Sequence, residues 1–155
     1  MNVSADELAK RLETFKARAK EERVKLTPQR LEIFKAVAKS LEHPDAERIF
    51  ETIHMSMPTV SLDTVYRTLW LLEDLGLLST IGSRRGGTRF DANLKTHHHF
   101  VCTRCGRIRD FESPALDALP VPEEAKAFGQ VSGSRVEVRG LCERCLRKAS
   151  REGKS

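Results

Sequence analysis

The sequence has no long hydrophobic run. No apolar segment approaches the ~18–20 residues that a membrane-spanning helix needs, although hydrophobic residues make up 39% of the 155-residue chain. The opening segment, MNVSADELAKRLETFK, mixes acidic and apolar positions and has no uninterrupted apolar stretch of the signal-peptide type. The apolar fraction is still sufficient for a folded core. We therefore expect a cytoplasmic protein that does not bind membranes.

The charge of the chain is not concentrated in one half. Residues 1–91 contain 15 Lys/Arg and 14 Asp/Glu, a net charge of +1, whereas residues 92–155 contain 12 and 8, a net charge of +4. A basic excess permits nucleic-acid binding but does not demonstrate it. Any DNA-binding function must therefore depend on local groups.

Cysteine is absent from the first half of the chain. All four cysteines lie after residue 100, in the two CxxC pairs Cys102/Cys105 and Cys142/Cys145. In the cytoplasmic protein that we expect, paired CxxC motifs favour zinc over disulfides. Four thiolates fill a tetrahedral coordination sphere, which predicts a structural Zn²⁺ site. The alternatives are two unlinked reduced pairs or a redox CxxC motif.

Four helices are predicted in the first half of the chain. Each begins after a residue suited to cap it, and apolar residues then recur at helical spacing. Pro44 is expected to end the second helix at His43, and Gly76 to end the fourth. Residues 77–81 and 88–91 are typical of two strands joined by a glycine-rich turn. The predicted caps are Ser4, Thr27, Asp45 or a neighbour of it, and Ser61.

This order of elements predicts a winged helix-turn-helix domain over residues 1–91. Its fourth helix would enter the major groove of DNA, as recognition helices do. Tyr66 and Arg67 are the best candidates to read bases, with Thr64 beside them. Arg84 and Arg85 at the hairpin tip would reach phosphates or the minor groove. Alternatively, Tyr66 is half-buried and Arg67 pairs with the acidic residue four positions earlier.

Residues 92–155 have a different pattern. Alternation predicts strands within 97–110 and 135–139, whereas 114–128 suggests a short helix interrupted by Pro120 and Pro122. The charged tail from Leu146 onward is predicted to be helical. The whole chain is thus predicted to be α+β, with a small second α/β domain. A domain of this size needs a metal, a partner subunit or both to be stable.

A histidine-rich segment begins this second domain. His97 and His99 share one face of an extended segment, and His98 points the other way. Imidazole and carboxylate ligands together suit Fe²⁺, Mn²⁺ or Zn²⁺. Spacing alone favours metal binding by the three histidines no more than it favours a solvated surface segment. Other potential ligands are His43, Asp91 and Asp110.

Six segments carry the most specific signals, in this order: LTPQRLEIFKAV at 26–37, HPDAERIF at 43–50, SLDTVYRTLWLLEDLGLL at 61–78, RFD at 89–91, HHHFVCTRCGRIRDF at 97–111 and GLCERC at 140–145. Together they resemble the ferric uptake regulator (Fur) family of bacterial metal- and peroxide-responsive repressors. The similarity spans roughly residues 8–150.

The resemblance implies an N-terminal DNA-binding domain and a C-terminal dimerisation domain. It implies a homodimer that binds palindromic double-stranded DNA operators and carries structural zinc on the four cysteines. It also implies a regulatory Fe²⁺ or Mn²⁺ site with ligands from both domains. That site maps onto His43, Asp91, His97, His99 and Asp110.

Aspartate at both carboxylate positions resembles the peroxide-sensing (PerR) branch, since iron-uptake repressors more often carry glutamate. In that branch, bound Fe²⁺ reduces H₂O₂ and the oxidant attacks His97 or His43, so that the metal is lost. With Mn²⁺ the repressor binds DNA but responds poorly to peroxide. Because zinc would occupy all four cysteines, a disulfide-based sensor is disfavoured.

The chain departs from the pattern of its relatives in two ways. Arg67 is the residue of iron-uptake repressors, where some peroxide sensors have Asn. Gly133 and Ser134 stand where relatives often carry a histidine of an accessory metal site, so we expect that site to be absent or degraded. An iron-, zinc- or manganese-responsive uptake repressor is therefore the main alternative.

Two alternatives lie outside the regulators. A metal-dependent hydrolase would need an open coordination position and a general base, and the chain contains neither HExxH nor a Ser-His-Asp pattern. A zinc-stabilised interaction module would lack salt-sensitive DNA affinity. We therefore expect a regulator and not an enzyme.

Overall fold

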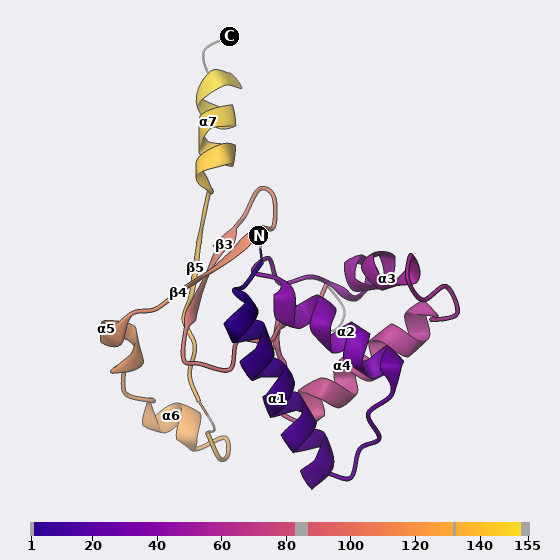
Figure 1. Ribbon diagram of the computed structural model, residues 1–155. Coiled ribbons are helices and arrows are strands. Elements are labelled where there is room, and N and C mark those ends of the chain that lie inside the picture. The colour runs from indigo at the N-terminus through magenta and orange to yellow at the C-terminus, as the bar shows by residue number, and fades with distance from the viewer. Residues whose placement is uncertain (1, 83–86, 132, 153–155) are drawn as a thin grey trace. The chain divides into compact units, whose positions relative to one another are not determined.

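The computed structural model describes residues 2–82, 87–131 and 133–152 (Figure 1). The chain forms two compact units, Met1–Leu94 and Lys95–Ser155. The sequence predicted a boundary after Asp91. Helices and strands occur together, as expected for an α+β protein. No helix in the described part of the chain has the length and apolar character needed to cross a membrane.

The first unit contains four helices, α1 (Ala5–Glu21), α2 (Pro28–Lys39), α3 (Ala46–His54) and α4 (Leu62–Asp74). Each predicted cap is confirmed, because its side chain accepts a hydrogen bond from the backbone N–H three residues later. Gly76, with φ of +69°, ends α4 by a turn in which the N–H of Leu77 donates to the carbonyl of Leu72.

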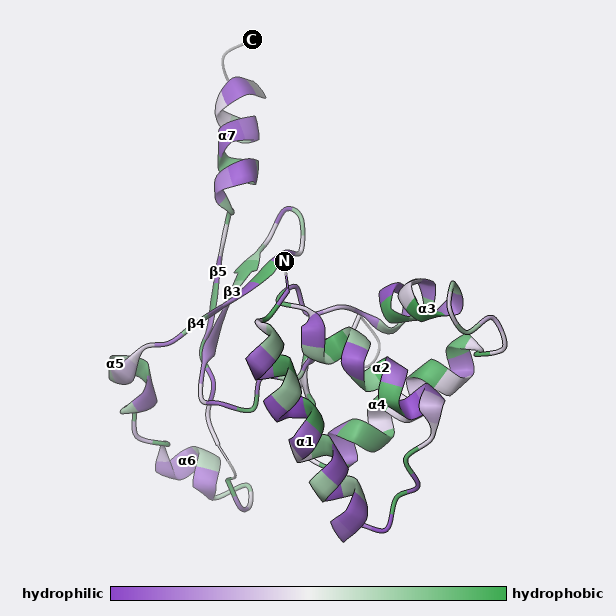
Figure 2. Cartoon of the chain, viewed as in Figure 1, coloured by the Kyte–Doolittle hydropathy of each residue, from purple (hydrophilic) through white to green (hydrophobic). Residues whose placement is uncertain are grey.

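The four helices enclose one apolar core. Phe15 of α1 and Phe34 of α2 lie with ring centroids 4.6 Å apart, and the edge of Trp70 meets Phe90 at 5.3 Å. Figure 2 shows hydrophobic and hydrophilic residues interleaved along each helix, as expected where only one face is buried. The core includes Phe15, Ile33, Phe34, Val37, Ile49, Ile53, Val65, Leu69, Leu72 and Phe90.

A two-stranded hairpin follows α4. Strand β1 (Ser79–Ile81) pairs antiparallel with β2 (Arg89–Asp91), with Ser79 opposite Asp91. The hairpin of the predicted winged helix is therefore present. Arg84 and Arg85, which were predicted to contact DNA, lie outside the described residues.

The predicted end of α2 is wrong. The helix ends at Lys39, not at His43, because other groups satisfy its last carbonyls. The N–H of Val3 donates to the carbonyl of Lys39 at 2.9 Å, and Arg11 donates to that of Ala38 at 3.1 Å. His43 therefore lies in the loop between α2 and α3.

The second unit is built on a three-stranded sheet of order β4-β3-β5. Strand β3 (His98–Cys102) pairs antiparallel with β4 (Ile108–Phe111) and parallel with β5 (Glu137–Gly140). The predicted interrupted helix is present as two short turns, α5 (Pro114–Asp117) and α6 (Glu123–Lys126). The last helix, α7 (Glu143–Glu152), begins earlier than predicted, directly after Cys142.

Candidate metal centres and nucleic-acid interface

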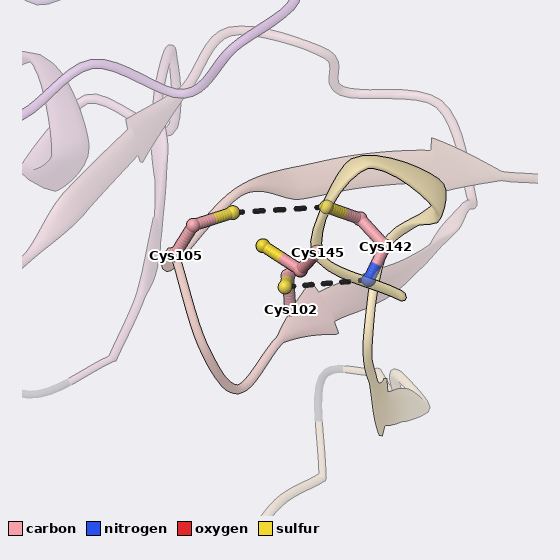
Figure 3. Close-up of side chains that lie close together, drawn as sticks. All are labelled: Cys102, Cys105, Cys142 and Cys145. Carbon is pink, nitrogen blue, oxygen red and sulfur yellow. Dashed lines mark hydrogen bonds between the residues drawn. The ribbon is translucent and has the colours of Figure 1, made fainter. Parts of the chain in front are cut away.

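The four cysteines converge in the second unit (Figure 3). Cys102 ends β3 and Cys105 lies in the turn that leads to β4, whereas Cys142 directly precedes α7 and Cys145 lies in its first turn. Their sulfur atoms all lie within 4.8 Å of one another, and those of Cys105 and Cys142 are 3.8 Å apart. This convergence contradicts the alternative of two unlinked pairs. It provides the four soft ligands of a closed tetrahedral zinc site.

The ionisation of these thiols also fits a divalent cation. The backbone N–H of Cys142 donates to the sulfur of Cys102 at 3.3 Å and, as the largest cause, lowers the pKa of that thiol to about 6. Burial, in contrast, raises the pKa of Cys145 to about 12. Four adjacent thiols resist joint ionisation, whereas a bound cation stabilises all four thiolates. The donor set therefore fits Zn²⁺.

The first unit brings His43 and Asp91 together. The Nε2 atom of His43 lies 3.8 Å from the Oδ2 atom of Asp91. Strand β2 fixes this arrangement, because the N–H of Phe90 donates to the carbonyl of Pro44 and Arg89 donates to that of His43. His43 has a left-handed φ of +49°, which costs on the order of 1–3 kcal/mol in a residue with a side chain and is common at functional sites.

The second unit brings together His97, His99 and Asp110. His99 pairs with Asp110 across β3 and β4, and its Nε2 atom lies 3.5 Å from the Oδ1 atom of Asp110 and 3.0 Å from the Nε2 atom of His97. The Nδ1 atom of His97 lies 2.7 Å from the carbonyl of Lys95. Since a carbonyl only accepts, Nδ1 of His97 carries the proton and Nε2 is left to bind a metal.

His98 points to the opposite face of the sheet, as predicted. Its Nδ1 atom accepts a hydrogen bond from the N–H of Val136 at 3.3 Å, and its Nε2 atom lies 3.1 Å from the Oδ1 atom of Asp117. The ring also lies against Phe111, with centroids 5.5 Å apart. His98 thereby connects β3 with the chain before β5 and with α5, a role that the sequence analysis did not assign to it.

Helix α4 carries the other predicted DNA contacts. Arg67 is 78% exposed and lies 3.4 Å from Asp63, the pairing anticipated as the alternative to base reading. Tyr66 is half-buried and its hydroxyl donates to Glu47 of α3 at 2.7 Å. Thr64 and Arg67 line a surface cavity of about 180 Å³ together with the first turn of α2. Polar groups of two helices therefore meet at one surface of this unit.

Comparison with known proteins identifies relatives over most of the chain. The model of the ferric uptake regulator family matches residues 21–137. The peroxide-responsive repressor PerR of Staphylococcus aureus strain USA300 is 30% identical over 148 residues, which cover 96% of this chain and all of that protein.

Solved structures share the fold. The ferric uptake regulator of Helicobacter pylori is 22% identical, covers 94% of this chain and 97% of its own, and superposes with a TM-score of 0.71. A zinc-bound manganese uptake regulator is 29% identical, with coverage of 82% and 97% and a TM-score of 0.62. The matches to the family model and to the staphylococcal repressor show that this chain belongs to the ferric uptake regulator family of metal-responsive, DNA-binding transcription regulators.

Proposed function

We propose that this protein is a metal-dependent transcriptional repressor that senses hydrogen peroxide by oxidation of a ligand histidine. The observation that carries the proposal is the donor set. Each unit contributes an aspartate close to histidine, with Asp91 beside His43 and Asp110 beside His97 and His99. These hard oxygen and imidazole ligands suit Fe²⁺ or Mn²⁺, whereas the soft thiolates suit zinc.

The five residues His43, Asp91, His97, His99 and Asp110 are proposed to hold one regulatory ion, Fe²⁺ or Mn²⁺. The four cysteines are proposed to hold Zn²⁺, whose binding energy contributes to folding of the second unit. Because the regulatory ligands come from both units, bound metal would favour one arrangement of the units over others. A ligand shifts a conformational equilibrium only by its difference in affinity for the two states, and about 5.5 kcal/mol changes a ratio of 1:99 to 99:1.

Peroxide sensing follows from the chemistry of the ligands. Fe²⁺ held by these residues would promote cleavage of the O–O bond of H₂O₂. One peroxide oxygen would then be transferred to a ring carbon of His97 or His43 and the other would leave as water, so that the imidazole supplies the two electrons overall. An oxidised imidazole is a poor ligand. The carboxylates of the two aspartates are not oxidised as easily as an imidazole ring, and the thiols would be bound by zinc. Loss of this histidine ligand would release the metal, and the protein without its regulatory metal would dissociate from DNA.

DNA recognition is assigned to α4 and to the hairpin. Thr64, Tyr66 and Arg67 would contact base edges, and Arg84 and Arg85 would contact the backbone or the minor groove. A homodimer would present two copies of α4 about 34 Å apart, which matches successive major grooves of a palindromic operator.

One observation favours a second candidate function within the same family. Arg67 on α4 is the residue that resembles iron-uptake repressors, and a manganese uptake regulator is among the similar structures at 29% identity. The alternative is a repressor that reports the level of iron, manganese or zinc, with no response to peroxide.

One experiment distinguishes the two candidate functions. Protein loaded anaerobically with Fe²⁺ or with Mn²⁺ is treated with H₂O₂, and its peptides are analysed by mass spectrometry while DNA binding is measured in parallel. We expect one added oxygen on the peptide of His97 or His43, and loss of DNA binding, with Fe²⁺ only. Oxidation confined to cysteines would rule out the histidine mechanism. Metal-dependent DNA binding that is insensitive to peroxide would support the uptake repressor.

A further inference from the structure

We infer that Glu47 is a positioning residue for DNA recognition. Its carboxylate accepts the hydroxyl hydrogen of Tyr66, and this contact restricts which base edges Tyr66 can read. The inference rests on the proposed function, because it assumes that α4 contacts base pairs. It concerns a residue of α3 that the sequence analysis did not connect with DNA.

The geometry determines which atom donates. The Tyr66 hydroxyl lies 2.7 Å from the Oε1 atom of Glu47 and donates to it, at the usual length of an O–H···O hydrogen bond. An ionised carboxylate can only accept hydrogen bonds. The phenol must therefore donate its single hydrogen to Glu47, and only its oxygen lone pairs remain available to a further partner.

Packing holds the Tyr66 end of this contact, and the start of α3 places Glu47, whose side chain is exposed. The ring of Tyr66 packs against the core of the first unit. Glu47 lies in the first turn of α3, which Asp45 caps by accepting from the N–H of Arg48 at 2.9 Å. Tyr66 is thus directed by two helices, so its hydroxyl has a defined position before DNA is bound.

Arg67 is held much less firmly than Tyr66. Its partner Asp63 lies on the same helix, and both side chains are more than 70% exposed, at 78% and 75%. Exposed ion pairs of this kind contribute little energy and are screened by salt. Arg67 can therefore turn toward DNA at low cost, whereas the ring of Tyr66 stays packed against the core beside Glu47.

The consequence concerns base identity. In the major groove, adenine and cytosine present amino groups that donate, whereas the guanine O6 and N7 atoms and the thymine O4 atom accept. A free phenol could bond to either class. With its hydrogen bound by Glu47, Tyr66 can only accept, so it selects the amino group of adenine or cytosine.

The contact itself can be measured in the whole protein because Tyr66 is its only tyrosine. The hydrogen bond to Glu47 is the largest cause that raises the pKa of Tyr66, followed by burial and by the charges of Glu47 and Asp45. Absorbance titration of the phenol should show a lower pKa in Glu47→Ala than in the wild type. Glu51→Gln, which removes a charge one turn further along α3, is the matched control and should leave the pKa unchanged.

The effect on recognition is tested by selection. Manganese-loaded wild type, Glu47→Ala, Tyr66→Phe, the double variant and Glu51→Gln are each used to select bound duplexes from a randomised DNA library, which are then sequenced. We expect Glu47→Ala and Tyr66→Phe to weaken the preference for one base pair, at the same position of each half-site, by at least about fivefold. The double variant should weaken this preference no further, and Glu51→Gln should select the wild-type sequence.

Two results would overturn the inference. One is a pKa of Tyr66 that does not fall in Glu47→Ala, and the other is wild-type base preference in Glu47→Ala or in Tyr66→Phe. If the wild type selects no sequence at all, the proposed DNA-binding function fails. The titration separates this outcome from failure of the Glu47–Tyr66 contact.

Discussion

At the scale of single residues, the three consecutive histidines have different tasks. His97 and His99 are proposed metal ligands, whereas His98 binds the N–H of Val136 and lies beside Asp117 on the other face of the sheet. Alternation along an extended segment predicted this division. It could not predict Val136 or Asp117 as partners, because the contact with Val136 spans 38 positions and depends on the order of strands in the sheet.

Replacement of His98 by alanine should loosen the second unit locally. The change removes the acceptor of the Val136 N–H and leaves a cavity at a side chain that is 1% exposed. We expect the free energy of local opening around β5 and α5 to fall by about 1–3 kcal/mol, measured by amide hydrogen exchange. Asp117→Asn should cost less, because the Asp117 side chain is itself 37% exposed. His54→Ala, at an exposed histidine of α3, should leave this region unchanged.

Replacement of one cysteine should remove the structural metal. Cys142→Ser takes away one of four converging sulfur atoms, the one that lies 3.8 Å from the sulfur of Cys105. Because zinc binding energy is folding energy, the variant should lose zinc and most of the circular dichroism signal of the second unit. Thr103→Ala, beside Cys102, should retain the metal. A folded Cys142→Ser protein without zinc would show that the metal is not structural.

At the scale of helices and strands, features that depend on neighbouring residues could be predicted from the sequence, whereas features that depend on distant residues could not. The four caps follow from short-range sequence rules, and the structure confirms them. The end of α2 depends instead on Val3 and Arg11, which lie far away in the sequence and bind its last carbonyls. The hydrogen bond between Glu47 and Tyr66 likewise joins two helices and has no signature in the sequence.

The N-terminal cap of α4 should make a measurable contribution to the free energy of unfolding. The Ser61 hydroxyl accepts a hydrogen bond from the N–H of Thr64 at 3.2 Å. Ser61→Ala should lower the free energy of unfolding of the first unit by about 1 kcal/mol. Urea unfolding followed by fluorescence of Trp70, the only tryptophan of the chain, reports on this unit. Ser61→Asn keeps an acceptor and should be nearly neutral, and equal losses in the two variants would contradict a capping role.

At the scale of the whole molecule, the ligand sets could be predicted more fully than their action. Doubled CxxC motifs indicated the cysteine cluster before the structure did. For the regulatory set, spacing suggested His97 and His99, but Asp110 joins them only because the pairing of β3 with β4 places it opposite His99. His43 approaches Asp91 because β2 binds the loop before α3. Such placement depends on tertiary pairing and is not encoded in local spacing.

The central claim is that one regulatory ion controls DNA binding. The most direct measurement is a gel-shift titration with Mn²⁺, using a duplex selected by the wild-type protein and comparing wild type with His99→Ala. We predict that only the wild type gains DNA affinity with Mn²⁺, while both proteins keep their zinc and their dimeric state. An unchanged response to Mn²⁺ in His99→Ala would contradict the proposed five-ligand site and the mechanism built on it.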